Sequence, residues 1–288
     1  MNLKGSINPF VSYLKTFAKV RSSLLLEIDT SQKAFVSKVF SEDRASVLYS
    51  AISFEDCNMT VLSNDSEKEL AGNRIKAGIL IQLPKFIKIV ERLGADLDKD
   101  GNSDFKVNIE YDKLLNADGT VDYIVTSITF ASALLKMKMD GFRISELKYL
   151  SDETFNNVVF NVQDQYSFDL SPETIATIIK TSDIVKIDPR KDTLVFFVDG
   201  KDVFVKDLVP EGKQPNFVYQ IGTLDEVPDY EIRIPIFREK FIQMMDKSTE
   251  TFRVIMGRRK TNGSYIVDRI LFDSEDSQTK VVISKVNE

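Results

Sequence analysis

Residues 167–208 read SFDLSPETIATIIKTSDIVKIDPRKDTLVFFVDGKDVFVKDL, and this stretch contains the pattern that decides the fold. Its SPETIATIIKTSDIVK segment (171–186) has apolar residues three and four positions apart, which is typical of an amphipathic helix. Ser171 before Pro172 has the form of an N-cap followed by proline at the first helical position. The segments on either side have the composition of β-strands. The stretch therefore predicts the order strand, helix, strand, strand.

Three more stretches of the chain have the same helical spacing, and strand-like segments fill most of the remainder. The further helices are expected at 8–21, 84–94 and 235–247. Asn8 before Pro9 again has the form of a cap, and Pro84 and Pro235 suit a first helical position. Four helices among many short strands indicate a largely antiparallel β protein.

The order helix, strands, helix, strands occurs twice along the chain. A chain of 288 residues is long enough for two domains, which are expected at 1–150 and 158–288 with a connector at about 140–157. The halves share no obvious residue identity, so the duplication is one of element order. The prediction is an α+β protein with two similar antiparallel-sheet domains, each with two helices, and long loops at 63–78 and 209–230.

The composition argues against most enzyme classes. The chain has no histidine and one cysteine, Cys57, so the usual general base, the commonest metal ligand and an intramolecular disulfide are all missing. No glycine-rich phosphate loop, signal peptide or membrane-length apolar run is present. We therefore expect a non-enzymatic cytoplasmic protein without cofactor or metal. Carboxylates and lysines leave a metal-dependent nuclease or hydrolase open as an alternative.

Positive charge is concentrated on the predicted helices. The chain has 38 Lys and Arg against 44 Asp and Glu, a net charge of -6, yet the four helical windows carry +3, +2, 0 and +1 in chain order. The remainder must hold -12. An acidic chain is repelled by nucleic acid, so a role on DNA requires this kind of local segregation.

The helical charges also share faces. Lys85, Lys88 and Arg92 fall on one side of their helix, opposite Phe86 and Val90. The first and last predicted helices have similar polar stripes, whereas the helix at 171–186 mixes charges on its outer face. Lysine on the solvated side of a helix is the commonest surface pattern, and it explains any one of these stripes by itself. Three of them in an acidic chain favour a shared basic surface.

These features together resemble the DNA sliding clamps, the two-domain processivity factors of T4-like phages and of eukaryotes and archaea. Besides the opening stretch, the likeness is carried by LKTFAKVRSSLLLEI (14–28) and by TFRVIMGRRKTNGSYIVDRILF (251–272) followed by TKVVISKV. The resemblance covers nearly the whole chain but rests on element order and charge, with few identical residues and no short signature motif. It implies a ring-forming protein of three chains that encircles DNA, in the host cytoplasm if a phage encodes it.

The resemblance further implies which residues touch DNA and partners. Duplex DNA would be contacted without sequence specificity by the basic residues that match the lining helices: Lys15, Lys19, Arg21, Lys85, Lys88, Arg92, Lys180, Lys186, Arg238, Lys240 and Lys247. The DNA polymerase and the clamp loader would dock through short peptides near the connector. Leu147, Tyr149 and Leu150 are the candidate pocket residues, and an ordinary buried strand is the alternative for them.

Other signals favour different functions less strongly. A β-rich tail or capsid component of a phage or virus explains the strands and the acidity without needing basic helices. The segment 96–107 imitates a calcium loop, but its twelfth position is Val107 where a bidentate Glu belongs. The basic run GRRKTNG (257–263) is expected at a hairpin tip, and Cys57 as an inert strand residue.

Overall fold

The computed structural model divides into two compact units, and each is described by itself. Unit 1 comprises Met1–Val39 and Tyr49–Leu150, and unit 2 comprises Phe40–Leu48 and Ser151–Glu288. The structure describes residues 2–5, 7–29, 32–56, 60–61, 74–79, 83–93, 105–115, 117, 119, 121–132, 135–140, 152–159, 163–185, 192–246, 248–261, 263–274 and 278–286.

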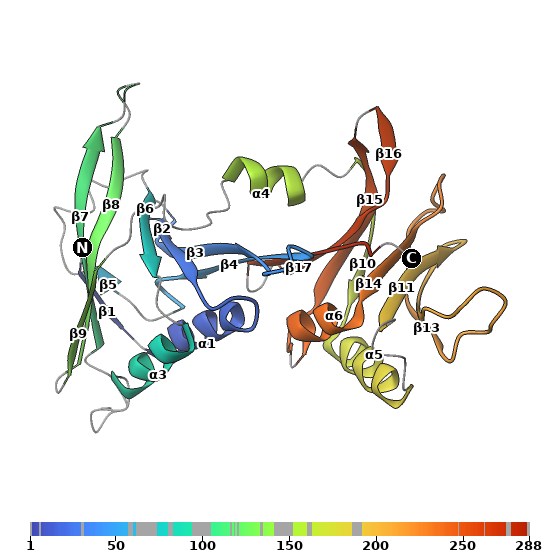
Figure 1. Ribbon diagram of the computed structural model, residues 1–288, viewed down its shortest axis with the longest axis horizontal. Helices are drawn as coiled ribbons and strands as arrows, with labels where there is room; N and C mark the ends of the chain where they lie inside the picture. The colour runs from blue at the N-terminus through green and yellow to red at the C-terminus, as the bar shows by residue number, and fades with distance from the viewer. Residues whose placement is uncertain are drawn as a thin grey trace. The chain divides into compact units, whose positions relative to one another are not determined.

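Unit 1 has two helices, α1 (Ile7–Ala18) and α3 (Leu83–Leu93), on one side of a sheet (Figure 1). Its strands are β1 (Asn2–Gly5), β2 (Leu24–Asp29), β3 (Ala34–Phe40), most of β4 (Ser46–Ser53), β5 (Thr60–Val61), β6 (Arg74–Ile79), β7 (Phe105–Leu115), β8 (Val121–Ala131) and β9 (Lys136–Asp140). They are ordered β3-β2-β6-β8-β7-β1-β5, with β9 paired to β8. The β6–β8 pair is parallel, and the β7–β8 and β8–β9 pairs are antiparallel.

A cluster of phenylalanines holds the helices of unit 1 to its sheet. Phe10 of α1 lies 5.1 Å from Phe35 of β3 and 6.3 Å from Phe130 of β8, measured between ring centroids. Phe86 of α3 lies 5.1 Å from the same Phe130. All four rings are fully buried. Burying a phenylalanine contributes about 1.5–3 kcal/mol relative to leaving it exposed, so this cluster fixes which face of each helix points away from the sheet.

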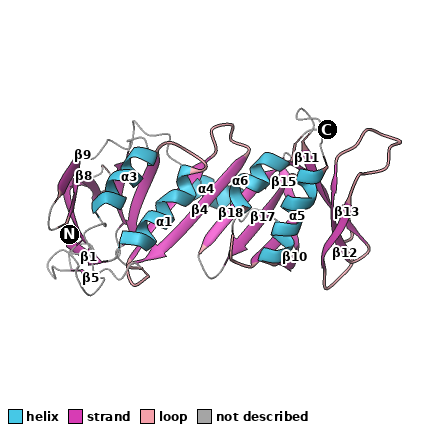
Figure 2. Ribbon diagram, turned by 90° about the horizontal axis from the view of Figure 1, so that it is seen from below, coloured by secondary structure: helices cyan, strands magenta, loops and turns pink. Residues whose placement is uncertain are grey.

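Unit 2 has three described helices, α4 (Asp152–Val159), α5 (Pro172–Ile184) and α6 (Arg238–Met245). Its strands are β10 (Gln163–Leu170), β11 (Thr193–Asp199), β12 (Asp202–Asp207), β13 (Val218–Thr223), β14 (Arg233–Phe237), β15 (Phe252–Thr261), β16 (Ser264–Ile266), β17 (Arg269–Ser274) and β18 (Thr279–Ser284). One group is ordered β10-β15-β17-β18, with β16 paired to β15. The other is ordered β13-β12-β11-β14. Figure 2 shows α5 and α6 in front of these strands.

The core of unit 2 repeats the arrangement of unit 1. Phe196 of β11, Phe241 of α6 and Phe272 of β17 form a triangle with centroid distances of 5.8, 6.3 and 5.9 Å, and all three are fully buried. Where β10 meets β13, Phe168 packs on Gly222, and a Cβ on Gly222 would lie 2.3 Å from Phe168 Cδ2. The close approach therefore requires glycine at this position.

The predicted α+β class is confirmed, and so are the four predicted helices, with changes at their ends. Ser171 caps α5 as predicted, because its side chain accepts a hydrogen bond from the Thr174 amide. Asn8 is not a cap: it lies inside α1, which begins at Ile7. Pro235 is not the start of a helix either, since it lies in β14 opposite Val195. β14 is an edge strand, where the missing N–H of proline costs no ladder bond.

Some described elements were not predicted from the sequence. α4 falls in the polar stretch after residue 150. Among the side chains of α4 that the structure describes, Phe155 is the buried one. The expected loop 63–78 contains most of β6. β13 lies within the expected loop 209–230, at the segment FVYQIGTL (217–224), whose composition does predict a strand. The basic run at 257–263 does end at a hairpin turn, but β15 continues through it to Thr261, where it pairs with Ser264.

Candidate nucleic-acid interface

The outer face of α1 is polar, with one lysine on the helix and a second in the turn directly after it. Phe10, Tyr13 and Phe17 are buried against the sheet, while Lys15 and Lys19 are exposed on the opposite side. The helix ends at Ala18, and a tight turn follows in which Val20 and Arg21 both donate to the Phe17 carbonyl. This turn keeps Lys19 beside the helix and leaves Arg21 only partly exposed.

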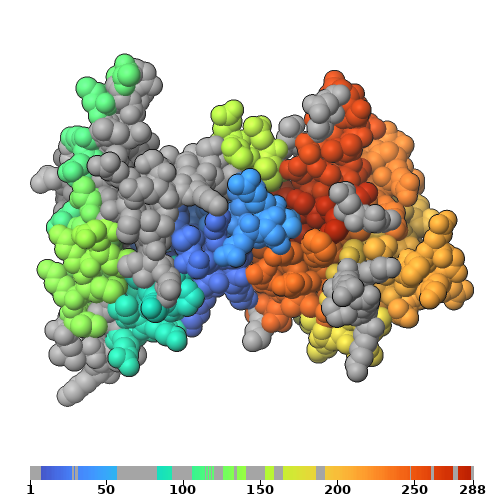
Figure 3. Space-filling model, in the orientation of Figure 1, coloured from blue at the N-terminus to red at the C-terminus, as the bar shows by residue number. Residues whose placement is uncertain are grey.

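The outer face of α3 carries three cations. Lys85, Lys88 and Arg92 are exposed, while Phe86 and Val90 are fully buried. The predicted division of this helix into a basic and an apolar face is therefore confirmed. Within the part of the chain that the structure describes, no carboxylate is paired with any of these three cations. Figure 3 shows α3, in teal, at the surface of unit 1.

One ion pair joins the two helices across this surface. Lys15 Nζ lies 2.6 Å from Glu91 Oε1, with side-chain exposures of 56% and 42%. Exposed pairs of this kind contribute roughly 0–1 kcal/mol, so the contact aligns the helices without removing either charge from solvent. We call the exposed cations of α1, of the turn directly after it and of α3 the basic helix face: Lys15, Lys19, Lys85, Lys88 and Arg92. It holds five cations against the single carboxylate of Glu91.

The helices of unit 2 present a different surface. On α5, Lys180 is exposed together with Glu173 and Asp183. Hydrogen bonds from its own backbone amide and from Ser171 lower the pKa of Glu173, so this carboxylate at the helix N-terminus stays ionised well below neutral pH. On α6, Glu239 is exposed. Two predicted contacts, Lys186 and Lys247, lie outside the described residues.

Arg238, a predicted DNA contact, is engaged inside unit 2. Its Nε donates to Ser182 Oγ at 2.8 Å, its Nη1 to Asp192 Oδ2 at 3.1 Å, and its Nη2 to Asp183 Oδ1. The side chain is only 14% exposed. These bonds tie the start of α6 to the end of α5 and to the residue before β11. The structure thus corrects the interpretation of Arg238 as a cation open to solvent.

Lys240 is engaged as well. Its Nζ lies 2.7 Å from Asp43 Oδ2, and its side chain is 15% exposed. Partial burial raises the pKa of Asp43, but hydrogen bonds from Lys240, Ser41 and the Ala45 amide outweigh burial and hold it below its ordinary value. The Asp43 carboxylate is therefore ionised at neutral pH, and its contact with Lys240 fastens α6 to the 40–48 segment of unit 2. Sequence spacing placed Lys240 on a polar stripe, but it could not reveal this distant partner.

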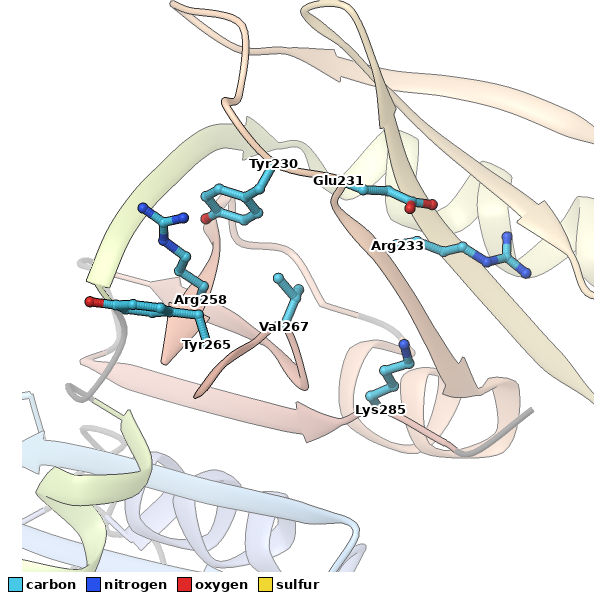
Figure 4. A pocket seen from close by; sticks show the side chains of 7 residues that line it. All are labelled: Tyr230, Glu231, Arg233, Arg258, Tyr265, Val267 and Lys285. Carbon is cyan, nitrogen blue, oxygen red and sulfur yellow. The ribbon is translucent and has the colours of Figure 1, made fainter. Parts of the chain in front are cut away.

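A pocket of about 740 Å³ lies in unit 2. Its lining residues are Tyr230, Glu231, Arg233, Arg258, Tyr265, Val267 and Lys285. At one end the Arg258 guanidinium lies 4.8 Å from the Tyr230 ring centroid and 4.7 Å from that of Tyr265 (Figure 4). Glu231, Arg233 and Lys285 form the rest of the wall around Val267.

The sequence did not predict this pocket. Its residues come from segments that are separate in the sequence. Of these residues, Arg258 stands out in the sequence only as part of the basic run at 257–263. The residues predicted for partner binding, Leu147, Tyr149 and Leu150, lie outside the described residues. The same is true of the calcium-like segment at 96–104 and of Cys57.

Within the described ranges, no three His, Cys, Asp or Glu residues are grouped so that they could hold a metal ion. Over the same residues, no helix is long and apolar enough to cross a membrane.

Solved sliding clamps match this chain over its full length. The PCNA of A. fulgidus, solved with the C-terminal region of FEN-1, matches with a TM-score of 0.60 at 10% identity and is covered over 99% of its chain. The PCNA2–PCNA3 complex of Sulfolobus tokodaii matches with a TM-score of 0.59 at 11% identity over 100% of that chain. The DNA polymerase III subunit beta of Pseudomonas aeruginosa gives a TM-score of 0.62 at 10% identity.

The chain spans 65% of that bacterial subunit, and about two thirds of the other bacterial clamps it matches, including a Helicobacter pylori beta clamp bound to a DNA ligase peptide. No protein-family model matches the sequence, and no curated protein sequence matches it. The likeness is therefore one of structure. The chain has the sliding-clamp fold, which confirms at the level of fold the resemblance seen in the sequence.

Proposed function

We propose that this protein is a DNA sliding clamp, a non-catalytic ring that encircles duplex DNA and tethers the replicative polymerase. The observation that carries the proposal is the basic helix face on an acidic chain with the clamp fold. Exposed lysines and an arginine on rigid helices provide phosphate contacts without base contacts, and such contacts hold DNA while allowing movement along it. The alternative function, a β-rich tail or capsid component, does not require an exposed basic surface of this kind.

The ring is proposed to contain three copies of the chain, with unit 1 and unit 2 as its clamp domains. This chain matches archaeal PCNA over nearly the full length of both proteins. In the described part of the sheets, β9 has β8 as its one partner and β13 has β12. Each is an edge strand with unpaired backbone groups, and pairing β9 of one copy with β13 of the next removes both edges.

The pocket of unit 2 is proposed to receive a peptide of the polymerase or of the clamp loader. Three cations line it against one carboxylate, and Val267 lies between them. A peptide with an apolar side chain next to a carboxylate complements this wall. Peptides are bound to two of the matching clamps, which supports the proposal. The protein is proposed to act where DNA is replicated, in the cytoplasm of a bacterial host if a phage encodes it.

Light scattering after size exclusion tests the ring. We expect about 98 kDa, three times the 32.7 kDa chain, at high protein concentration. Gln220→Pro, within β13, introduces a residue that cannot donate to a strand ladder and should give a monomer, with circular dichroism as the check that the chain stays folded. A Pro at an exposed loop position, Glu211→Pro, is the control. A firm monomer for the unaltered protein at high concentration would contradict the proposal.

A further inference from the structure

The two units differ sharply in the charge that their helices expose. Unit 1 has the basic helix face, with five exposed cations and one carboxylate. On α5 and α6 of unit 2, Lys180 is the one exposed cation among the described residues, beside the exposed carboxylates Glu173, Asp183 and Glu239. The contrast is larger than sequence counting suggests, because that count includes Arg238 and Lys240 as available charges.

The missing charge of unit 2 is used inside the unit. Arg238 is 14% exposed and donates to Ser182, Asp183 and Asp192, and Lys240 is 15% exposed and paired with Asp43. A phosphate that approached either cation would have to displace a carboxylate already in place. Arg238 cannot exchange partners without leaving the partly buried Asp192 uncompensated, and Lys240 is itself mostly buried beside Asp43. These two residues therefore stabilise unit 2 and are not accessible to a duplex.

We infer that each chain grips duplex DNA with unit 1 alone, through the basic helix face, and that the helices of unit 2 make no phosphate contact. This inference rests on the proposed clamp function and deepens it. A ring built this way holds DNA by one basic face per chain rather than two. Fewer phosphates are neutralised, so the attraction is weaker and depends less on salt than in a ring with two equally basic units.

A matched pair of charge reversals tests the inference. Lys88→Glu on α3 and Lys180→Glu on α5 each reverse one exposed helical lysine that has no ion-pair partner among the described residues. Binding of the intact protein to a fluorescent duplex is measured by anisotropy from 50 to 200 mM salt. Each lost phosphate contact reduces the slope of log binding constant against log salt by about 0.9. Solution mass and thermal unfolding of both variants must match the unaltered protein.

We expect Lys88→Glu to weaken binding at least about fivefold and to reduce the salt slope, while Lys180→Glu stays within about twofold. Equal losses in both variants would overturn the inference and leave the clamp proposal standing, because DNA would then touch both units. No loss in either, with DNA still held, would also overturn it, since the basic helix face would not be the contact. Failure of the unaltered protein to hold DNA at all would instead refute the clamp proposal.

Discussion

The Arg238 network separates a structural role from a DNA-binding role, and Arg238→Gln tests the difference. Glutamine keeps most of the stem but removes the charge and the fork of donors that reach Ser182, Asp192 and Asp183. After the change Asp192 loses its side-chain donor at Oδ2, while its other oxygen, Oδ1, is already buried without a hydrogen bond in the described structure. A partly buried carboxylate would then be left without compensation.

The magnitude follows from how exposed each contact is. Asp183 is 63% exposed, so its ion pair contributes little. Asp192 is 26% exposed against 14% for Arg238, and a charged hydrogen bond at such a site contributes about 1.5–3 kcal/mol. With the weaker bond to Ser182 included, we expect Arg238→Gln to lower the free energy of unfolding by about 2–3 kcal/mol.

Urea unfolding followed by circular dichroism measures this loss. Lys180→Gln on neighbouring α5 is the matched control, and as an exposed substitution it should stay within about 0.5 kcal/mol. In the anisotropy assay Arg238→Gln should bind DNA within about twofold of the unaltered protein under conditions where it is folded. A variant of unchanged stability that lost DNA affinity would show the opposite, that Arg238 contacts DNA and does not stabilise unit 2.

Three further predictions concern other parts of the molecule. Gly222→Ala places a Cβ against the Phe168 ring and should cost roughly 1–3 kcal/mol in urea unfolding, and a stability equal to wild type would contradict the packing described. The pKa of Asp43 is lowered in the folded state, so its stabilisation is present above the ordinary pKa and is lost as pH falls through the lowered one. Asp43→Asn should therefore be less stable than wild type at pH 7, and the difference should shrink as pH falls below the ordinary value of 3.8. A difference that stays constant from pH 7 through this acid range would show that the ionised Asp43 paired with Lys240 is not the cause. Finally, Arg258→Ala should weaken capture of a polymerase or loader peptide without changing DNA binding, and an unchanged peptide affinity measured by calorimetry would exclude the pocket.

The spacing of apolar residues predicted much of the fold, because the side chains that pack a helix against its sheet recur every three or four residues. The helical spacing around Phe10, Phe86 and Phe241 identified three helices, since each ring is buried against its own sheet. The start of the helix predicted at 235–247 was placed too early, because Pro235 suits the first position of a helix as well as an edge strand. Only the pairing of β14 with β11 decides between the two. α4 has too short an apolar pattern to be recognised.

The exposure of a cation was predicted correctly where it depends only on the spacing along its own helix. It was missed where a carboxylate from a distant segment pairs with the cation. Lys85, Lys88 and Arg92 are exposed as their spacing indicated. Arg238 and Lys240 follow the same kind of pattern, yet their partners lie as far away in sequence as Ser182 and Asp43. A helical stripe tells which side of a helix is polar, and it does not tell whether a carboxylate from another segment already covers that side.

The most direct test of the central claim is topological. A linear duplex is fixed to a bead at one end, and the protein is allowed to thread from the free end, which is then closed with a bulky cap. After washing at high salt, which screens phosphate contacts, we expect the protein to stay on the capped duplex and to leave within minutes once a restriction enzyme cuts it. Release at the same rate from capped and cut DNA would show that the protein is bound to DNA and not closed around it.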